Sequence, residues 1–529
     1  MTPQTTVADA APDLGPRNGL RGHPWLTLVS VAIGVMMVAL DGTIVAIANP
    51  AIQKDLGASL ADVQWITNAY LLALAVALIT AGKLGDRFGH RLIFLIGTTG
   101  FALSSGLIAL SGSVSMVVGF RVLQGLCGAL LMPAALGLLR ATFPPEKLNM
   151  AIGLWGMVIG ASTAGGPIIG GVLVEHVNWQ SVFFINVPVG ALALALGLVI
   201  LKDHRSEHAP KSFDVPGILL LSAAMFCLIW ALIKAPAWSW GDARTLGFLA
   251  AALVGFVLFV LWQLRTRDPL LPLGLFRSVP LSAGTALMVL MAFAFMGGVF
   301  FVTFYLQNVH GMTPVNSGLH LLPLTGMMIV TSPAAGALIA RYGPRPPLVI
   351  GMVCTAVACF GMTTLSVGTG TVPMSLWFAL LGAGLAPVMV GATDVIVGNA
   401  PLRDAGVASG LQQAAMQVGG SLGTAVLGAV VAARVDHQLP VRWADAGLPA
   451  LPADQLSRAS AAVQLGVAPV PPGTRPEAAA KISGVAHETF VSGMHLGFAV
   501  AGCVAAVAAL VALLTKRGVN AEGLNVGVG

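Results

Sequence analysis

Two charged residues lie inside long apolar stretches, where an isolated charge is expensive. Asp41 is in LDGTIVAIANPAI (40–52) and Arg121 is in RVLQGLCGALLMP (121–133). On insertion scales a carboxylate at the centre of a spanning helix costs ~2.5 kcal/mol or more, so Asp41 is a functional candidate by default. Because burial disfavours the charged form of a carboxyl group, we predict that Asp41 binds and releases protons.

Arg121 is the natural partner for this acid. By helical rise, both residues lie about two turns below the outer surface of their spans. We predict that Arg121 holds the Asp41 carboxylate charged until a proton or a cationic substrate displaces it. Two alternatives remain: a purely structural ion pair for Asp41, and an Arg121 that binds backbone carbonyls for packing.

The elements that position these residues are membrane-spanning helices. The 529-residue chain is 56% hydrophobic and 9% charged, whereas soluble proteins average about 25% charged residues. A spanning helix needs ~20 apolar residues, and backbone groups in lipid must be satisfied within the helix. We predict an all-α polytopic membrane protein with fourteen spans, near residues 26–50, 63–82, 92–111, 114–139, 150–174, 181–201, 215–234, 246–264, 281–307, 316–340, 346–367, 373–399, 409–433 and 491–515.

The basic residues predict the orientation. With the N-terminus inside, the short outer loops hold only Lys54, Lys234 and Arg244, while the inner segments hold most of the other basic residues. The positive-inside rule then predicts a multi-pass protein of the inner (cytoplasmic) cell membrane with both termini cytoplasmic. Because the basic residues lie in loops rather than in a stripe, the net charge of +6 predicts no nucleic-acid partner.

An internal repeat organises the chain. GKLGDRFGHR (82–91) and GALIARYGPR (336–345) align at an offset of 254 residues, and the same offset relates Gly97 to Gly351 and Pro133 to Pro387. Duplicated halves are how many secondary transporters alternate access. The predicted parts are a disordered cytoplasmic tail (1–22), an N-terminal six-helix bundle (23–202), inserted helices 7 and 8 with flanking loops (203–277), a C-terminal six-helix bundle with outer loop 435–490 (278–517), and a cytoplasmic tail (518–529). Segment 435–490 could fold as a small outer cap or stay mobile.

Four motifs together resemble the 14-span drug:proton antiporter branch (multidrug efflux family) of the major facilitator superfamily. They are the two stretches around Asp41 and Arg121, GKLGDRFGHR between spans 2 and 3, and GASTAGGPIIGG (160–171) in span 5. The resemblance implies two six-helix bundles plus two inserted helices. It also implies alternating access driven by the proton gradient, without a cofactor. The implied partners are a small-molecule substrate, protons and membrane lipid, and the implied state is a monomer.

The resemblance assigns two further groups of residues. In the loop between spans 2 and 3, Asp86 is expected to accept hydrogen bonds from a helix N-terminus or to pair with an arginine, latching the two halves. Pro167 is expected to bend span 5, and its neighbouring glycines are expected to let helices approach closely. The latch residues are Gly82, Asp86, Arg87, Gly89 and Arg91, and the antiporter motif comprises Gly160, Gly165, Gly166, Pro167, Gly170 and Gly171.

Weaker candidates are polar residues within or at the ends of spans. Asp394 and Glu175 are candidates for a second acidic site, although the interpretation as ordinary solvated or snorkelling residues is open for both. Neither a nucleotide-binding Gly-rich loop nor a catalytic or metal-binding constellation is present, so neither an ATPase nor another enzyme is predicted. The predicted cavity-lining residues are Asn68, Tyr70, Gln124, Trp155, Gln307 and Gln413.

These patterns favour a proton-coupled antiporter that exports lipophilic, in some cases cationic, compounds such as drugs, antibiotics and dyes. One rival is a dedicated transporter of a single metabolite or natural product, for example a siderophore, an amino acid or a self-made antibiotic. Another rival, from a different class, is a membrane sensor that transports nothing. The internal repeat weighs against the sensor.

Overall fold

The computed structural model describes residues 20–58, 60–202, 214–401 and 404–515, and these residues form helices joined by short turns without any strand. Within them, 14 helices are long and apolar enough to cross a membrane. The predicted all-α polytopic fold with fourteen spans is therefore confirmed. Of the two predicted tails, only residues 20–22 are among the described residues. Residues 516–517, which we assigned to the C-terminal bundle, also lie outside the described residues.

The helices fall into two sets of six long helices and an inserted pair. The first set is α1 (Pro24–Leu56), α2 (Leu60–Phe88), α3 (His90–Ala109), α4 (Val114–Thr142), α5 (Pro145–His176) and α7 (Asn186–Ile200), which follows the short α6 (Gln180–Phe184). The inserted pair is α8 (Val215–Trp238) and α9 (Ala243–Gln263). The second set is α10 (Val279–Phe304), α12 (Leu322–Tyr342), α13 (Arg345–Met362), α14 (Thr371–Gly398), α15 (Ala405–Asp445) and α17 (Pro476–Ala512). Shorter elements of this half are η1 (Leu273–Arg277), the π-helical turn η2 (Tyr305–Val309), α11 (Pro314–His320) and α16 (Ala453–Val463).

The segment GKLGDRFGHR is mostly helix, which corrects the predicted loop. Helix α2 continues to Phe88, and α3 begins at His90, so Gly89 alone separates them. Gly89 has φ +95°, a conformation that residues with a Cβ rarely adopt, and it reverses the chain within one residue. In the second copy Gly343 (φ +84°) ends α12 in the same way.

Packing repeats between the halves as the sequence repeat predicts. In the first half α4 packs on α2 and α3, and α1 packs on α5; in the second half α14 packs on α12 and α13, and α10 packs on α15. Gly97 of α3 lies against the Cys127 carbonyl of α4, and its repeat mate Gly351 of α13 lies against the Gly384 carbonyl of α14. The same small-residue contacts therefore hold both bundles together.

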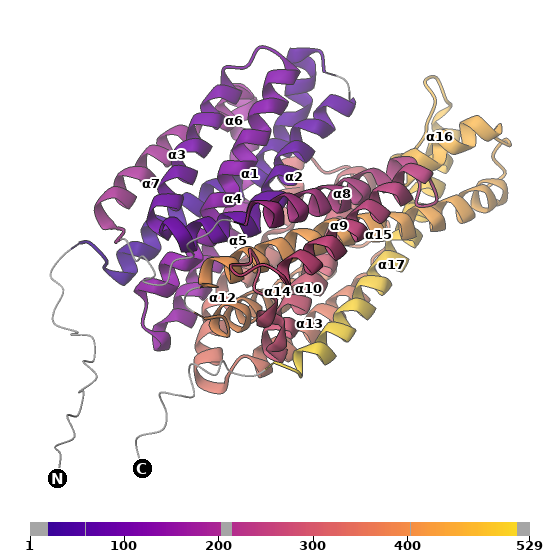
Figure 1. The fold of residues 1–529 in the computed structure, drawn as a ribbon. Helices are drawn as coiled ribbons and strands as arrows, with labels where there is room; N and C mark the ends of the chain where they lie inside the picture. Colours follow the sequence, from indigo (N-terminus) through magenta and orange to yellow (C-terminus); the bar gives the residue numbers. More distant parts are fainter. Residues whose placement is uncertain (1–19, 59, 203–213, 402–403, 516–529) are drawn as a thin grey trace, which may run out of the picture.

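The halves meet where α2 crosses α15 and where α5 crosses α12. At the first crossing Gly82 and Gly406 touch through their backbones, and at the second a Cβ on Gly153 would lie 2.7 Å from the Ser332 carbonyl oxygen. Glycine at these positions lets the backbones approach more closely than any other residue would allow. The inserted helix α8 contacts both α2 and α15, so it spans the seam between the halves (Figure 1).

The two ends of the molecule differ. Helix α1 begins and α17 ends at the same end of the bundle, which we call the terminal end (Figure 1). At the opposite end the halves diverge, with α6 on one and α16 on the other. We call this opposite end the cap end.

Segment 435–490 is mostly helical, with short connections on either side of α16. Helix α15 has 41 residues and α17 has 37, so each is ~55–60 Å long, about twice the hydrocarbon thickness of a bilayer. Their ends at the cap end, with α16 and its connections, form a small helical cap, defined here as residues 440–482. Of the two possibilities left open by the sequence, the structure has the folded cap.

Candidate functional site

Asp41 and Arg121 form an ion pair sealed within the first half. Asp41 on α1 is 0% exposed and Arg121 on α4 is 1% exposed. The Arg121 guanidinium donates to Asp41 Oδ2 over 2.5 Å and, through Nε, to the Ile66 carbonyl of α2 over 3.0 Å. Its central carbon lies 4.2 Å from the centre of the Tyr70 ring, so an aromatic face covers the cation.

Three neutral polar residues complete this cluster. The amide nitrogens of Gln124 and Asn186 donate to Asp41 Oδ1 over 3.0 and 3.3 Å. The same two nitrogens also donate to Ser105 Oγ, over 2.6 and 3.3 Å. Gln124 Oε1 accepts from Arg121 over 2.6 Å. Both carboxylate oxygens are thus hydrogen-bonded by protein groups, which is the condition under which a buried charge is tolerated.

The sequence analysis found part of this cluster. It paired Asp41 with Arg121, and the structure brings them together. Gln124, which we expected to line a cavity, instead bonds Asp41 and Arg121. Ser105 and Asn186 were not predicted. Gln124 follows Arg121 by three residues on the same helix face, and this spacing was a usable signal that Gln124 contacts the pair.

The glycine motif of α5 holds α1 close. A Cβ on Gly166 would collide with the Thr43 hydroxyl, and one on Gly170 would lie 2.8 Å from the Ile44 side chain. These contacts flank the helical turn that carries Asp41. The other side of α5 faces the second half, where Gly171 lies against Val315 and Gly160 lies near Met328. Helix α5 is continuous through Pro167, and among the described residues a Cβ on Gly165 would meet only the Ile169 side chain of its own helix.

Asp86 joins the two halves at the terminal end. Its oxygens accept from the backbone N–H groups of Gly406, over 2.7 Å, and Val407, over 3.0 Å. These two groups lie in the first turn of α15, where the helix dipole favours a negative charge. His90 Nε2 lies 3.3 Å from the same carboxylate. The hydrogen bonding to a helix N-terminus that we expected of Asp86 is present.

Basic residues add contacts around this latch. Arg140 of α4 donates to the Ala400 carbonyl of the second half over 2.6 Å. Lys83 donates to the Pro269 carbonyl, which follows the inserted helices, over 3.0 Å. Arg91 instead donates within its own half, to Leu198 over 3.1 Å, and the Arg87 guanidinium lies 5.3 Å from the Phe88 ring centre.

The remaining candidates are dispersed. Asp394 is half-buried near the end of α14, whereas Glu175 is exposed at the end of α5. Gln413 is buried in α15, Asn68 is half-buried in α2, and half-buried Gln307 lies in the π-helical turn.

Two of the predicted cavity-lining residues have buried donors without partners in the described part of the chain. The Tyr70 hydroxyl and the Trp155 indole N–H have no hydrogen-bond partner among the described residues. These two side chains are 2% and 1% exposed. Unpaired buried donors are uncommon in folded proteins, and each one invites an explanation.

Comparison with known proteins settles the family. A sequence profile of the Major Facilitator Superfamily matches residues 31–424, which includes both repeats. The chain belongs to the major facilitator superfamily. The predicted family is therefore confirmed, and the paired bundles described above are the two halves of a major facilitator transporter.

Several relatives of this major facilitator protein are named as export or resistance proteins. It is 67% identical over 503 residues to the tetracenomycin C resistance and export protein of Streptomyces glaucescens, covering 95% of this chain and 93% of the relative. It is 35% identical over 409 residues to the multidrug resistance protein Stp of Mycobacterium tuberculosis, covering 77% and 76%. The fold resembles the crystal structure of the human organic anion transporter MFSD10 (TETRAN), with a TM-score of 0.61 at 10% identity over 93% of this chain and 99% of that one.

Proposed function

We propose that this chain exports antibiotic-like small molecules across the cytoplasmic membrane in exchange for protons, and that a compound of the tetracenomycin type is its cargo. The relative named for tetracenomycin C shares 67% identity along nearly the whole chain. Relatives named for multidrug resistance share 35% or less. This difference supports a narrow cargo range over a broad one.

The buried Asp41–Arg121 pair carries the proposal of proton coupling. Its charges are balanced only while Asp41 is ionised. Protonation of Asp41 leaves Arg121 as an uncompensated buried cation, a state that in soluble proteins costs about 3–5 kcal/mol. The protein relieves that cost by moving α1 against α4 or by admitting cargo near Arg121. Proton binding and a change of conformation are thereby linked.

The latch at the terminal end supplies the second part of the cycle. The distribution of basic residues supports a cytoplasmic terminal end, so the described state is closed toward the cytoplasm. Opening that end requires Asp86 to release the N-terminus of α15 and Arg140 to release Ala400. The proton gradient is then the energy source, and one chain contains both halves, which supports a monomeric unit.

Inverted membrane vesicles test the proposal. A pH gradient with an acidic vesicle interior is established, tetracenomycin C is added outside, and the internal pH is followed with a fluorescent dye. The wild-type protein should release protons when the compound is added, and Asp41→Asn should abolish this release. Glu477→Gln, which removes an exposed carboxylate at the start of α17, is the matched control and should behave as wild type. Proton release that survives in Asp41→Asn would contradict the proposed role of Asp41.

A further inference from the structure

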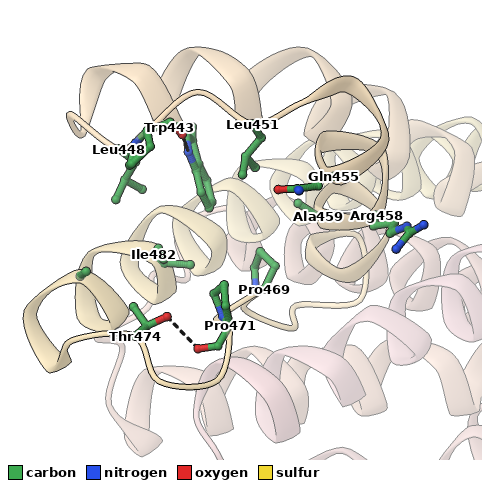
Figure 2. Close-up of a pocket in the computed structure, with 12 residues that line it drawn as sticks. Trp443, Leu448, Leu451, Gln455, Arg458, Ala459, Pro469, Pro471, Thr474 and Ile482 are labelled. Atoms are coloured by element: carbon green, nitrogen blue, oxygen red, sulfur yellow. Dashed lines mark hydrogen bonds between the residues drawn. The ribbon is translucent and has the colours of Figure 1, made fainter.

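The cap contains a cavity of about 410 Å³, well away from the Asp41 cluster. Figure 2 shows it between the end of α15, helix α16 and the start of α17. Its volume falls in the ~300–1,000 Å³ range of small-molecule sites. The lining residues are Trp443, Leu448, Pro449, Leu451, Gln455, Arg458, Ala459, Pro469, Pro471, Thr474, Ala478 and Ile482.

The walls of this cavity are apolar and stiff. Trp443 is buried, and its indole N–H donates to the Pro449 carbonyl over 2.9 Å. The Thr474 hydroxyl likewise donates to the Pro471 carbonyl over 2.7 Å. Because these polar groups are satisfied by the backbone, the Trp443 ring and the aliphatic and proline side chains are left to contact a ligand. An aromatic wall with several prolines loses little conformational entropy when a ligand binds.

The charge of the lining indicates the class of ligand. Arg458 is its one charged member, and no acidic residue lines the cavity. Arg458 is exposed at the rim with its side chain directed away from the cavity, while Gln455 points into it (Figure 2). Within the described chain no hydrogen bond or ion pair involves Arg458. A neutral aromatic molecule packs on Trp443 without a charge to satisfy, and an anionic one reaches Arg458 when that side chain turns toward the rim, whereas no lining residue pairs with a cation.

The cavity is built on the transport machinery itself. Helix α15 begins at the Asp86 latch, crosses α2 and α10, and ends with Trp443 in the cavity wall. Helix α17 supplies Ile482 and then packs along α13. In an exporter whose terminal end is cytoplasmic, the cap end is the side on which cargo leaves.

We propose that the cap cavity is a binding site for a neutral or anionic aromatic small molecule, the class of compound that the transporter releases. This inference rests on the proposed export function for the direction of transport and for the cargo. A lipid chain fits the position less well, because α15 extends about twice the hydrocarbon thickness and its end lies beyond the membrane core. The binding itself is measurable without transport, so the two proposals can fail separately.

Protection of an engineered cysteine tests the site in the full-length protein in lipid nanodiscs. Ala478→Cys places a thiol in the cavity wall, and Ser457→Cys places one on the exposed, non-lining face of α16. Each variant is labelled with a sulfonated, membrane-impermeant maleimide. The unsubstituted protein, whose five cysteines lie inside apolar segments, measures the background. The probes are anthraquinone-2-sulfonate, ethidium and monoolein.

Anthraquinone-2-sulfonate at about ten times its Kd should slow labelling of Ala478→Cys about tenfold and leave Ser457→Cys unchanged. Ethidium should protect much less. Protection by ethidium equal to that by the sulfonate would overturn the charge assignment, and protection by monoolein alone would identify a lipid site instead. No protection by any probe would overturn the proposal.

Two substitutions in the lining sharpen the test. Arg458→Gln should remove the preference for the anionic probe over ethidium, since it deletes the charge but keeps the cap fold. Trp443→Phe should keep part of the protection because it retains an aromatic ring, and Trp443→Ala should lose it. Circular dichroism and the unchanged labelling of Ser457→Cys in the same background show that the cap is folded. Unaltered protection in both Arg458→Gln and Trp443→Ala would contradict the site.

Discussion

At the scale of single residues, the Asp41 cluster brings together one acidic residue, one basic residue and three neutral polar residues in the interior of a largely apolar bundle. The Asp41 carboxylate accepts hydrogen bonds from Arg121, Gln124 and Asn186. In such a network the removal of one charged partner is more damaging than the removal of both, because the remaining charge has no water to solvate it.

This asymmetry gives a quantitative prediction. Arg121→Gln should lower the free energy of unfolding by about 3–5 kcal/mol, because it strands the Asp41 carboxylate. Adding Asp41→Asn to that variant should restore most of the stability but none of the proton-coupled export. Unfolding in mixed micelles measures the first quantity and vesicle transport the second. A double variant no more stable than Arg121→Gln alone would show that the pair is not energetically coupled.

The buried indole of Trp155 gives another residue-scale prediction. The Trp155 indole N–H is buried without a partner among the described residues, and an unsatisfied donor costs about 1–3 kcal/mol. If cargo supplies the missing acceptor, Trp155→Phe should leave stability unchanged or raise it while increasing the KM for export about tenfold. Thermal unfolding and concentration-dependent export separate the two effects. A loss of stability with an unchanged KM would indicate a packing role alone.

The sequence revealed the charged members of the cluster more readily than its neutral ones. Asp41 and Arg121 are conspicuous because ionised groups are rare inside spans. Ser105 and Asn186 are ordinary in membrane helices. Whether such a residue faces the interior depends on helix rotation, which a single apolar sequence does not encode strongly. Their roles became visible only when α3 and α7 were placed beside α1.

At the scale of elements, the N-terminus of α15 is held across the seam by a carboxylate from α2. Asp86→Asn keeps the shape of the side chain but removes its charge, so it should weaken the hold on Gly406 and Val407 and favour opening at the terminal end. Spectroscopic distances between labels on the two halves at that end should lengthen. Asp55→Asn, which alters a carboxylate bonded to Trp179 within the first half, is the control. Unchanged distances in Asp86→Asn would contradict the latch.

The inserted pair has its own anchor at Asp214, which caps α8. Burial alone raises the pKa of Asp214, but hydrogen bonds from Trp262, Gln263 and the Gly217 and Leu270 amides outweigh it, so the pKa lies below its usual value. A lowered pKa stabilises the folded state above the unfolded-chain value of about 3.9, and this stabilisation is lost as pH falls through the folded value.

Asp214→Asn should therefore increase hydrogen exchange in residues 263–277 at neutral pH. The difference from wild type should persist at about pH 4 and shrink only as pH falls through the lowered folded-state pKa of Asp214, where the wild-type carboxyl also becomes protonated. Asp242→Asn, which alters the cap of α9 at the opposite end, should not affect that segment. A difference independent of pH would show that hydrogen-bond geometry, rather than charge, is what matters at Asp214.

Apolar runs located the helices but not their ends. The predicted span 409–433 lies inside α15, which continues to Asp445 because its outer turns pack on α16 and α17 rather than on lipid. Hydropathy identifies the part of a helix that lies in the membrane, but it gives no signal for the continuation of that helix in water. The predicted loop 82–91 was wrong for the same reason, since charged turns at the end of α2 remain helical up to Gly89.

At the scale of the whole molecule, the 254-residue repeat predicted two similar bundles, and the structure has them. The contacts between halves join α2 with α15 and α5 with α12, and the repeat relates these two crossings to each other, because α2 corresponds to α12 and α5 to α15. The repeat alone did not predict which helices would meet. That arrangement depends on the relative placement of two folded bodies. The inserted pair breaks this symmetry, since α8 packs on the helices of only one of the two crossings, α2 and α15.

The glycines at these crossings lead to a prediction about the cycle as a whole. A methyl group on Gly82 would collide with the Gly406 carbonyl, and one on Gly153 would collide with the Ser332 carbonyl. Both clashes are between the two halves. Gly82→Ala and Gly153→Ala should therefore leave each bundle folded but prevent the halves from closing at the terminal end. Gly326→Ala in α12 is the matched control, because a methyl group there meets open space. The two crossing variants should bind cargo from the terminal end yet export none, with thermal unfolding close to that of the control. If they export normally, the halves do not alternate by closing at these two crossings.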